Sequence, residues 1–214
     1  MLEHRTISLS EQVFERLEAD ILSGKYAQGE ILTEMKLVAD LGVSRTPIRE
    51  ALHRLEQEHI IEMTGKGIVI LGVTQKDLED IFDIRVQIEG VASRLTAERI
   101  TEEELAELRE TLELQEFYVQ RKDADHIKMM DSKFHQLIYR FSRSSVYYDA
   151  LMPLHKKVQK YRKASVENQS RAQQSAKEHR AIFEAIEARD GALAERHTIE
   201  HIANAKAHIV KRGN

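Results

Sequence analysis

Two polar side chains fall inside an apolar stripe of the segment 123–142. The apolar positions recur at helical spacing and are Ile127, Met130, Phe134, Leu137, Ile138 and Phe141. Asp131 and His135 lie within this stripe and are four residues apart, so their side chains meet on one helix face. A buried ion without a partner costs roughly 3–5 kcal/mol, so this pair requires a compensating group.

Histidines recur on the apolar faces of two later segments. His179 lies within the apolar arc of the segment 171–190. In the segment 192–211, one stripe carries three histidines, and the residues alone do not choose among them: His197, His201 and His208. A cation held by three imidazoles and one carboxylate would suit zinc, nickel, manganese or iron better than calcium or magnesium. The alternative is that each histidine is a hydrogen-bonded core residue.

A second kind of chemistry is indicated by the arginines of the segment 44–55. Ser44 suits an N-cap, and Pro47 suits the first turn of a helix. Three arginines fall away from the apolar face of this helix: Arg45, Arg49 and Arg54. They are available to phosphates and base edges, as in a helix that enters a DNA groove.

The elements around this helix predict a winged helix-turn-helix over residues 8–71. The segment 34–41 has helical periodicity and is followed by Gly42, which can adopt the left-handed turn between two helices. Downstream, the β-branched runs 60–63 and 68–71 flank Thr64-Gly65-Lys66-Gly67, which is typical of a hairpin. A basic hairpin tip beside a recognition helix predicts a wing.

Helical periodicity dominates after Gly72, so we expect domains at 1–72 and 73–214. The fold class is therefore mainly α, with an all-helical second domain. Thr101 and Glu104 have capping-box spacing and indicate one of the helix starts. We expect six helices, near 75–99, 102–121, 123–142, 145–165, 171–190 and 192–211.

Composition is compatible with a soluble cytoplasmic protein. The chain has no cysteine, no apolar run of membrane-spanning length and no signal-peptide pattern at its start. Residues 1–72 hold 8 Lys and Arg against 12 Asp and Glu, a net charge of −4, which weakly opposes DNA binding. The net charge is positive within the segment 44–55, which holds three arginines and one glutamate. A dimer would place two such basic segments on one duplex.

The run 41–52, Leu-Gly-Val-Ser-Arg-Thr-Pro-Ile-Arg-Glu-Ala-Leu, resembles the core motif of the GntR family of bacterial transcription regulators. The resemblance implies that Arg45 and Arg49 contact the operator and that Thr46 lies at the helix entry. It also implies that the tip formed by Gly65, Lys66 and Gly67 reaches the minor groove. Many members carry an arginine where this chain has Met35 or Lys36, so the resemblance does not carry a backbone or base contact over to this position.

The second domain resembles the ligand-binding domain of the FadR-like branch of that family, called FCD. In its metal-binding members, an Asp-x-x-x-His pair is followed by one histidine on each of the last two helices. The resemblance implies the ligand set Asp131, His135, His179 and His201, and it favours His201 over His197. Six helices after the wing favour the metal-binding type over the acyl-CoA-binding type.

A metal with four protein ligands leaves coordination positions that could hold a small carboxylate. Arg85 corresponds to an arginine common in the family, and its guanidinium could pair with that carboxylate. The alternative for Arg85 is an exposed pair with Glu89, four residues later. Tyr139 and Asn204 are weaker candidates for contacts to the effector.

The first hypothesis is a homodimeric repressor that binds an inverted-repeat operator in double-stranded DNA. A metal and a small organic acid in the helical domain would control its affinity for the operator. A second hypothesis is a regulator for which the metal is itself the signal. A third is a metal-dependent hydrolase, but the chain has no His-Glu-x-x-His motif and no nucleophile with an evident base.

Overall fold

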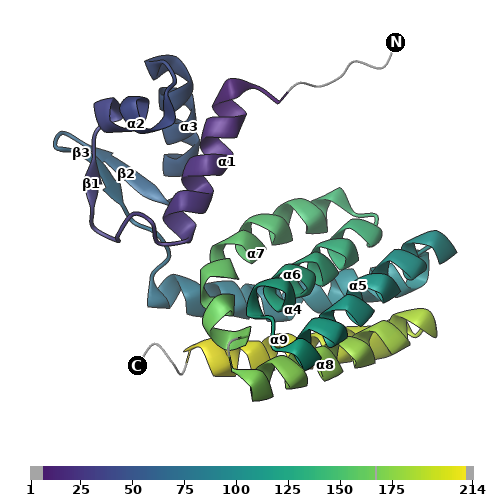
Figure 1. The fold of residues 1–214 in the computed structure, drawn as a ribbon. Coiled ribbons are helices and arrows are strands. Elements are labelled where there is room, and N and C mark those ends of the chain that lie inside the picture. Colours follow the sequence, from purple (N-terminus) through teal and green to yellow (C-terminus); the bar gives the residue numbers. More distant parts are fainter. Residues whose placement is uncertain (1–6, 167, 211–214) are drawn as a thin grey trace, which may run out of the picture. The chain divides into compact units, whose positions relative to one another are not determined.

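The computed structural model describes residues 7–166 and 168–210 and divides the chain into two compact units (Figure 1). The first unit is Met1–Thr74 and the second is Gln75–Asn214. Each unit has its own hydrophobic core, because the apolar faces of its helices are buried within that unit. Among the described residues, no helix is both long and apolar enough to cross a membrane.

The first unit is a winged helix-turn-helix. Its elements are α1 (Leu9–Leu22), β1 (Ile31–Leu32), α2 (Glu34–Leu41), α3 (Arg45–Gln57), β2 (Ile61–Thr64) and β3 (Gly67–Ile70). The helices α1 and α2 both pack against α3, and the strands form an antiparallel sheet in the order β1-β3-β2. Gly42 ends α2 with a φ of 66°, the left-handed turn expected between the two helices.

The wing differs from its predicted boundaries by one residue. The hairpin pairs Thr64 with Gly67, so the turn contains only Gly65 and Lys66, and both strands extend further toward the tip than expected. The third strand, β1, was not expected. It has two residues, which is too short for an alternating pattern to be recognised in a sequence.

The second unit contains six helices within its described residues, as expected. They are α4 (Gln75–Arg99), α5 (Glu102–Arg121), α6 (Ala124–Phe141), α7 (Ser145–Val166), α8 (Gln169–Glu187) and α9 (Gly191–Val210). The expected boundaries of α4 and α5 are confirmed, and the other four differ by a few residues at most. The Thr101–Glu104 capping box that begins α5 is also formed.

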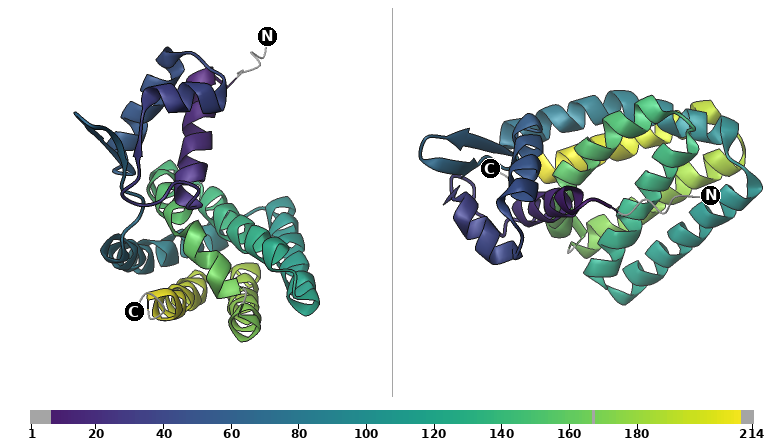
Figure 2. Two further views of the ribbon diagram at one scale, coloured as in Figure 1. Left: turned by 60° about the vertical axis from the view of Figure 1, so that its left-hand side comes forward. Right: turned by 90° about the horizontal axis from the view of Figure 1, so that it is seen from above.

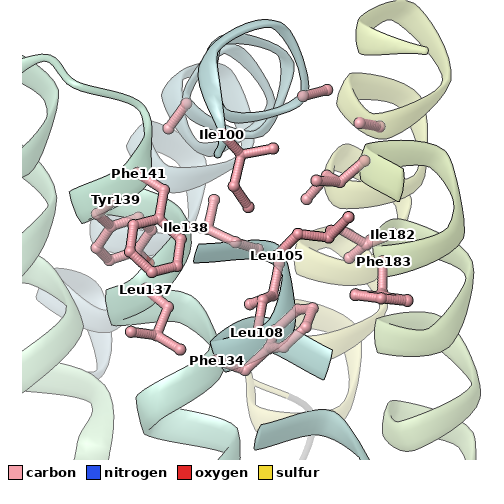
Figure 3. Packing of buried hydrophobic residues seen from close by; sticks show 14 of the residues in the cluster. Ile100, Leu105, Leu108, Phe134, Leu137, Ile138, Tyr139, Phe141, Ile182 and Phe183 are labelled. Atoms are coloured by element: carbon pink, nitrogen blue, oxygen red, sulfur yellow. The ribbon is translucent and has the colours of Figure 1, made fainter. Parts of the chain in front are cut away.

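These helices bury a large core and a smaller second cluster against one another. The helix α4 packs along α9, α5 packs against α6 and α8, and α8 packs against α9 (Figure 2). Figure 3 shows Leu105 and Leu108 of α5 facing Phe134 of α6 and Ile182 of α8. Because α6, α8 and α9 are fixed by this packing, polar side chains on their inner faces are held in defined positions.

Candidate metal centre and DNA-binding surface

Three histidines from three helices converge inside the helical unit. His135 of α6, His179 of α8 and His201 of α9 are buried, and each offers a ring nitrogen within 4.8 Å of the other two. The Nε2 atom of His201 lies 3.2 Å from Nε2 of His179 and 3.3 Å from Nε2 of His135. Within the described part of the chain, this is the group of histidine and acidic side chains whose geometry could hold a metal ion.

Asp131 lies at the edge of this histidine group. It is buried one turn before His135 on α6, and its Oδ1 atom is 3.7 Å from Nε2 of His179. The structure therefore brings the three predicted imidazoles together and places the predicted carboxylate beside one of them. A ligand role for Asp131 stays a prediction.

An oxygen faces the other ring nitrogen of each histidine. Nδ1 of His179 is 2.7 Å from Oε1 of Gln115, and Nδ1 of His201 is 2.7 Å from Oε2 of Glu178. Nδ1 of His135 is 3.3 Å from Oε2 of Glu89. An acceptor oxygen at Nδ1 favours the tautomer with its proton there, which leaves the Nε2 lone pair facing inward.

This donor set fits a divalent transition metal. Imidazole nitrogens lie about 2.0–2.1 Å from such an ion, so two of them on one ion are separated by roughly 3.0–3.4 Å. The observed separations of 3.2 Å and 3.3 Å fall in this range. Converging lone pairs repel one another, and a cation between them removes that repulsion.

The oxygens behind the histidines were not predicted as part of the site. Glu178 directly precedes His179 in sequence but supports His201 on another helix. Gln115 is 64 residues from His179, so no local spacing connects the two. His155 of α7 was also missed: it is fully buried, and its Nε2 is 2.8 Å from Oγ of Ser132. A polar residue in an apolar stripe, the signal that identified His135, could have identified His155.

Glu178 is held in its charged form. Burial by itself raises the pKa of its carboxyl group, but hydrogen bonds from His201 and Arg171 and the charge of Arg171 outweigh burial and lower the pKa to about 2. Arg171 Nη1 lies 3.0 Å from each carboxylate oxygen of Glu178. The acceptor behind His201 is therefore a carboxylate fixed from two sides.

The three predicted effector contacts lie in different surroundings. Arg85 of α4 and Tyr139 of α6 are almost completely buried. Asn204 of α9 is exposed and donates a hydrogen bond of 2.9 Å to Oε1 of Glu178, behind His201. The structure thus places Arg85 and Tyr139 inside the bundle and Asn204 at its surface, while effector binding by all three stays a prediction.

Arg85 and Glu89 form a buried ion pair, so the alternative of an exposed pair is wrong. Each side chain is only 1% exposed, and Nε of Arg85 donates to Oε1 of Glu89. Burial raises the pKa of Glu89, but the charge of Arg85 outweighs it and holds the pKa below its ordinary value. Nη1 and Nη2 of Arg85 are buried and have no hydrogen-bond partner among the described residues.

The winged unit presents its predicted DNA-contacting residues at the start of α3. Arg45, Thr46 and Arg49 are exposed. Nε of Arg49 lies 3.0 Å from Oε2 of Glu34, and Nη2 of Arg45 lies 3.0 Å from Sδ of Met35. The first residues of α2 thus contact both guanidinium groups, while base and phosphate contacts stay predictions.

The remaining members of the predicted set are Arg54 and the wing tip. Arg54 is already engaged: its Nη1 lies 2.5 Å from Oε2 of Glu11, and its guanidinium covers the Phe14 ring at 3.8 Å. These contacts join α3 to α1. Gly65 and Lys66 are exposed at the wing tip, with Gly67 partly buried beside them.

Each of the two units matches a known protein family. Residues 9–70 match the gntR family of bacterial regulatory proteins, and residues 80–204 match the FCD domain. The chain is 30% identical over 200 residues to the uncharacterized HTH-type transcriptional regulator YdhC of Bacillus subtilis (strain 168), covering 92% of this chain and 89% of that protein. It is 28% identical to the HTH-type transcriptional repressor RspR of Escherichia coli (strain K12), covering 92% and 87%.

A solved structure shows the same fold. E. coli McbR/YncC superposes with a TM-score of 0.82 at 24% identity, covering 98% of this chain and 100% of that one. The winged helix-turn-helix, the six-helix domain and these matches together identify the chain. It belongs to the gntR family of bacterial regulatory proteins and is a DNA-binding transcription regulator of the FadR-like branch, which carries an FCD domain.

Proposed function

We propose that this protein is a repressor whose affinity for its operator is controlled by a small organic acid bound near a divalent transition metal. The repressor assignment is supported by the relative RspR, which is named a transcriptional repressor. It acts as a homodimer on double-stranded DNA. A two-fold dimer presents two recognition helices, so the operator is an inverted repeat.

The observation that carries the metal proposal is the convergence of three Nε2 atoms from α6, α8 and α9. His135, His179 and His201 are the ligands, with Asp131 as the fourth. The ion is zinc, nickel, manganese or iron, because these metals accept several imidazoles together with a carboxylate. When bound, the metal supplies a positive charge and open coordination positions to which a carboxylate can bind.

The effector is an organic acid small enough to enter a bundle of six helices. Arg85 pairs with its carboxylate, because two nitrogens of this buried guanidinium make no hydrogen bond of ordinary geometry with the described residues. Tyr139 contributes a hydroxyl group from α6. Asn204 donates a hydrogen bond to Glu178 and so supports His201 on the metal side of the site.

The DNA-binding role of the recognition helix is tested by Arg49→Ala. An operator selected from a random duplex library is labelled, and binding is followed by fluorescence anisotropy at fixed salt. We expect a loss of about 1–3 kcal/mol in binding free energy, because a base-contacting arginine is removed. Arg109→Ala is the matched control, since Arg109 is a partly exposed arginine of the helical unit paired with Glu187. Equal affinity of Arg49→Ala and wild type would contradict the assignment.

The same assay separates an effector-controlled regulator from a metal-controlled one. Protein stripped of metal by a chelator is compared with metal-loaded protein, each with and without a panel of small carboxylic acids. In our proposal the stripped protein keeps its operator affinity and loses its response to the acids. If stripping alone changes the operator affinity, the metal is the signal. We assign no catalytic residues, because the sequence has no His-Glu-x-x-His motif and no nucleophile with an evident base.

A further inference from the structure

Glu89 lies between the proposed metal centre and the proposed effector site. Its Oε1 atom accepts a hydrogen bond from Nε of Arg85, and its Oε2 atom lies 3.3 Å from Nδ1 of His135. All three side chains are at most 2% exposed. One buried carboxylate therefore contacts both a proposed metal ligand and the residue proposed to bind the effector.

Both sides of this arrangement have unused hydrogen-bonding capacity. Nη1 and Nη2 of Arg85 make no hydrogen bond of ordinary geometry with the described residues, although the Tyr139 hydroxyl interacts with this guanidinium and a group so deeply buried normally satisfies its donors. Glu89 Oε2 makes no hydrogen bond that meets the usual geometry, so its contact to His135 is an ion-pair distance that can shorten. An anion bound at Arg85 would accept hydrogen bonds from Nη1 and Nη2. A metal bound at His135 would strengthen the contact between Nδ1 of His135 and Oε2 of Glu89.

We propose that Glu89 is a positioning residue that couples carboxylate binding at Arg85 to metal binding at His135. This inference rests on the proposed function and adds a regulatory link to it. The two ligands bind cooperatively, and the cooperativity is carried by the charge of a single side chain on α4.

The coupling follows from how Glu89 shares its charge. In the absence of an anion, the guanidinium of Arg85 draws the Glu89 carboxylate toward itself. A carboxylate bound at Nη1 and Nη2 takes part of the guanidinium charge, so Glu89 accepts more strongly from Nδ1–H of His135. A stronger acceptor at Nδ1 makes Nε2 a better metal ligand. By linkage, the metal must then raise the affinity for the carboxylate by the same factor.

The test uses Co²⁺ as the metal probe and acetate as the carboxylate probe, with the untagged full-length protein. The Co²⁺ Kd is measured from the visible absorption of the bound ion, with and without acetate. In wild type, we expect saturating acetate to lower this Kd by at least about fivefold. In Glu89→Gln, we expect Co²⁺ to bind about 10–100-fold more weakly and acetate to have no effect on the Kd.

Glu178→Gln is the matched control, because Glu178 occupies the same position behind His201 that Glu89 occupies behind His135. It should also weaken Co²⁺ binding but keep the full acetate effect. Glu89→Asp provides a second variant that keeps the charge opposite Arg85, in case Glu89→Gln does not fold. Its carboxylate is one methylene further from His135, so its acetate effect should be smaller than that of wild type.

The outcomes separate the inference from the function on which it rests. An undiminished acetate effect in both Glu89 variants would overturn the inference, since the coupling would then arise from acetate bound directly to the metal. Acetate without effect on wild type would also overturn it. Failure of wild type to bind Co²⁺ would instead count against the proposed metal centre itself.

Discussion

Met35 lies at the start of α2, at or next to a position where the family resemblance predicts an arginine that contacts DNA. This residue is 59% exposed, and its sulfur contacts the guanidinium of Arg45. A thioether cannot neutralise a phosphate, whereas the guanidinium of the arginine that the resemblance predicts here can. Its neighbour Lys36 does not simply replace that arginine, because Nζ of Lys36 lies 3.3 Å from Oε1 of Glu30.

Met35→Arg should therefore strengthen operator binding and make it more sensitive to salt. One additional phosphate contact raises the magnitude of the slope of log K against log salt concentration by about 0.9. The slope is measured by anisotropy over a series of salt concentrations. Met35→Leu, which adds no charge, is the control and should keep the wild-type slope. An unchanged slope in Met35→Arg would show that this position does not face the phosphates.

Among the elements, the wing depends on a close approach between β3 and β1. Gly67 begins β3 with a φ of 133°, a backbone conformation that other residues rarely adopt. A Cβ atom added there would lie 2.6 Å from the carbonyl oxygen of Leu32. Gly65, two residues earlier in the turn, has open space around it and no positive φ.

Gly67→Ala should destabilise the winged unit by about 1–3 kcal/mol, because it forces both a strained φ and a backbone contact. Gly65→Ala should change the free energy of unfolding by no more than about 0.5 kcal/mol. Urea unfolding of the full chain, followed by far-UV circular dichroism, measures the difference. Equal stability of the two variants would mean that the wing does not adopt this geometry.

Local sequence patterns predicted most of the helices and strands. The strand that they did not predict, β1, depends on pairing with a distant part of the chain. The helix α5 begins at a capping box, and α2 ends at a left-handed glycine, so short motifs marked these boundaries. The strand β1 is defined only by its pairing with β3, which lies about 40 residues away in sequence. Propensity and periodicity carry no information about such a partner.

In the candidate site, too, local sequence patterns predicted some residues and long-range contacts supplied the others. Polar residues in apolar stripes pointed to His135 and His179, and family resemblance selected His201 among three histidines. The oxygens behind them were not predictable, because Gln115 and Glu89 come from other helices and no sequence spacing connects them to these histidines. Arg85 was placed in the site, but its complete burial emerged only from the packing of α4 within the bundle.

For the whole molecule, the division into two units predicts that metal stabilises only one of them. A ligand present at 100 times its Kd stabilises the folded state by about 2.7 kcal/mol. We therefore expect metal to slow amide hydrogen exchange in α6, α8 and α9 and to leave residues 9–70 unchanged. Mass spectrometry of peptides from protein with and without a chelator gives this comparison. Protection confined to the winged unit would contradict the location of the site.

The central claim, that three buried histidines hold a metal in a DNA-binding regulator, is tested most directly by elemental analysis. Untagged wild-type protein is compared with the double variant His135→Ala, His179→Ala, and far-UV circular dichroism confirms that the variant is folded. We predict near-stoichiometric transition metal in wild type and its loss in the variant. Metal-free wild type that also fails to take up added zinc, nickel, manganese or iron would contradict the claim and make these histidines structural.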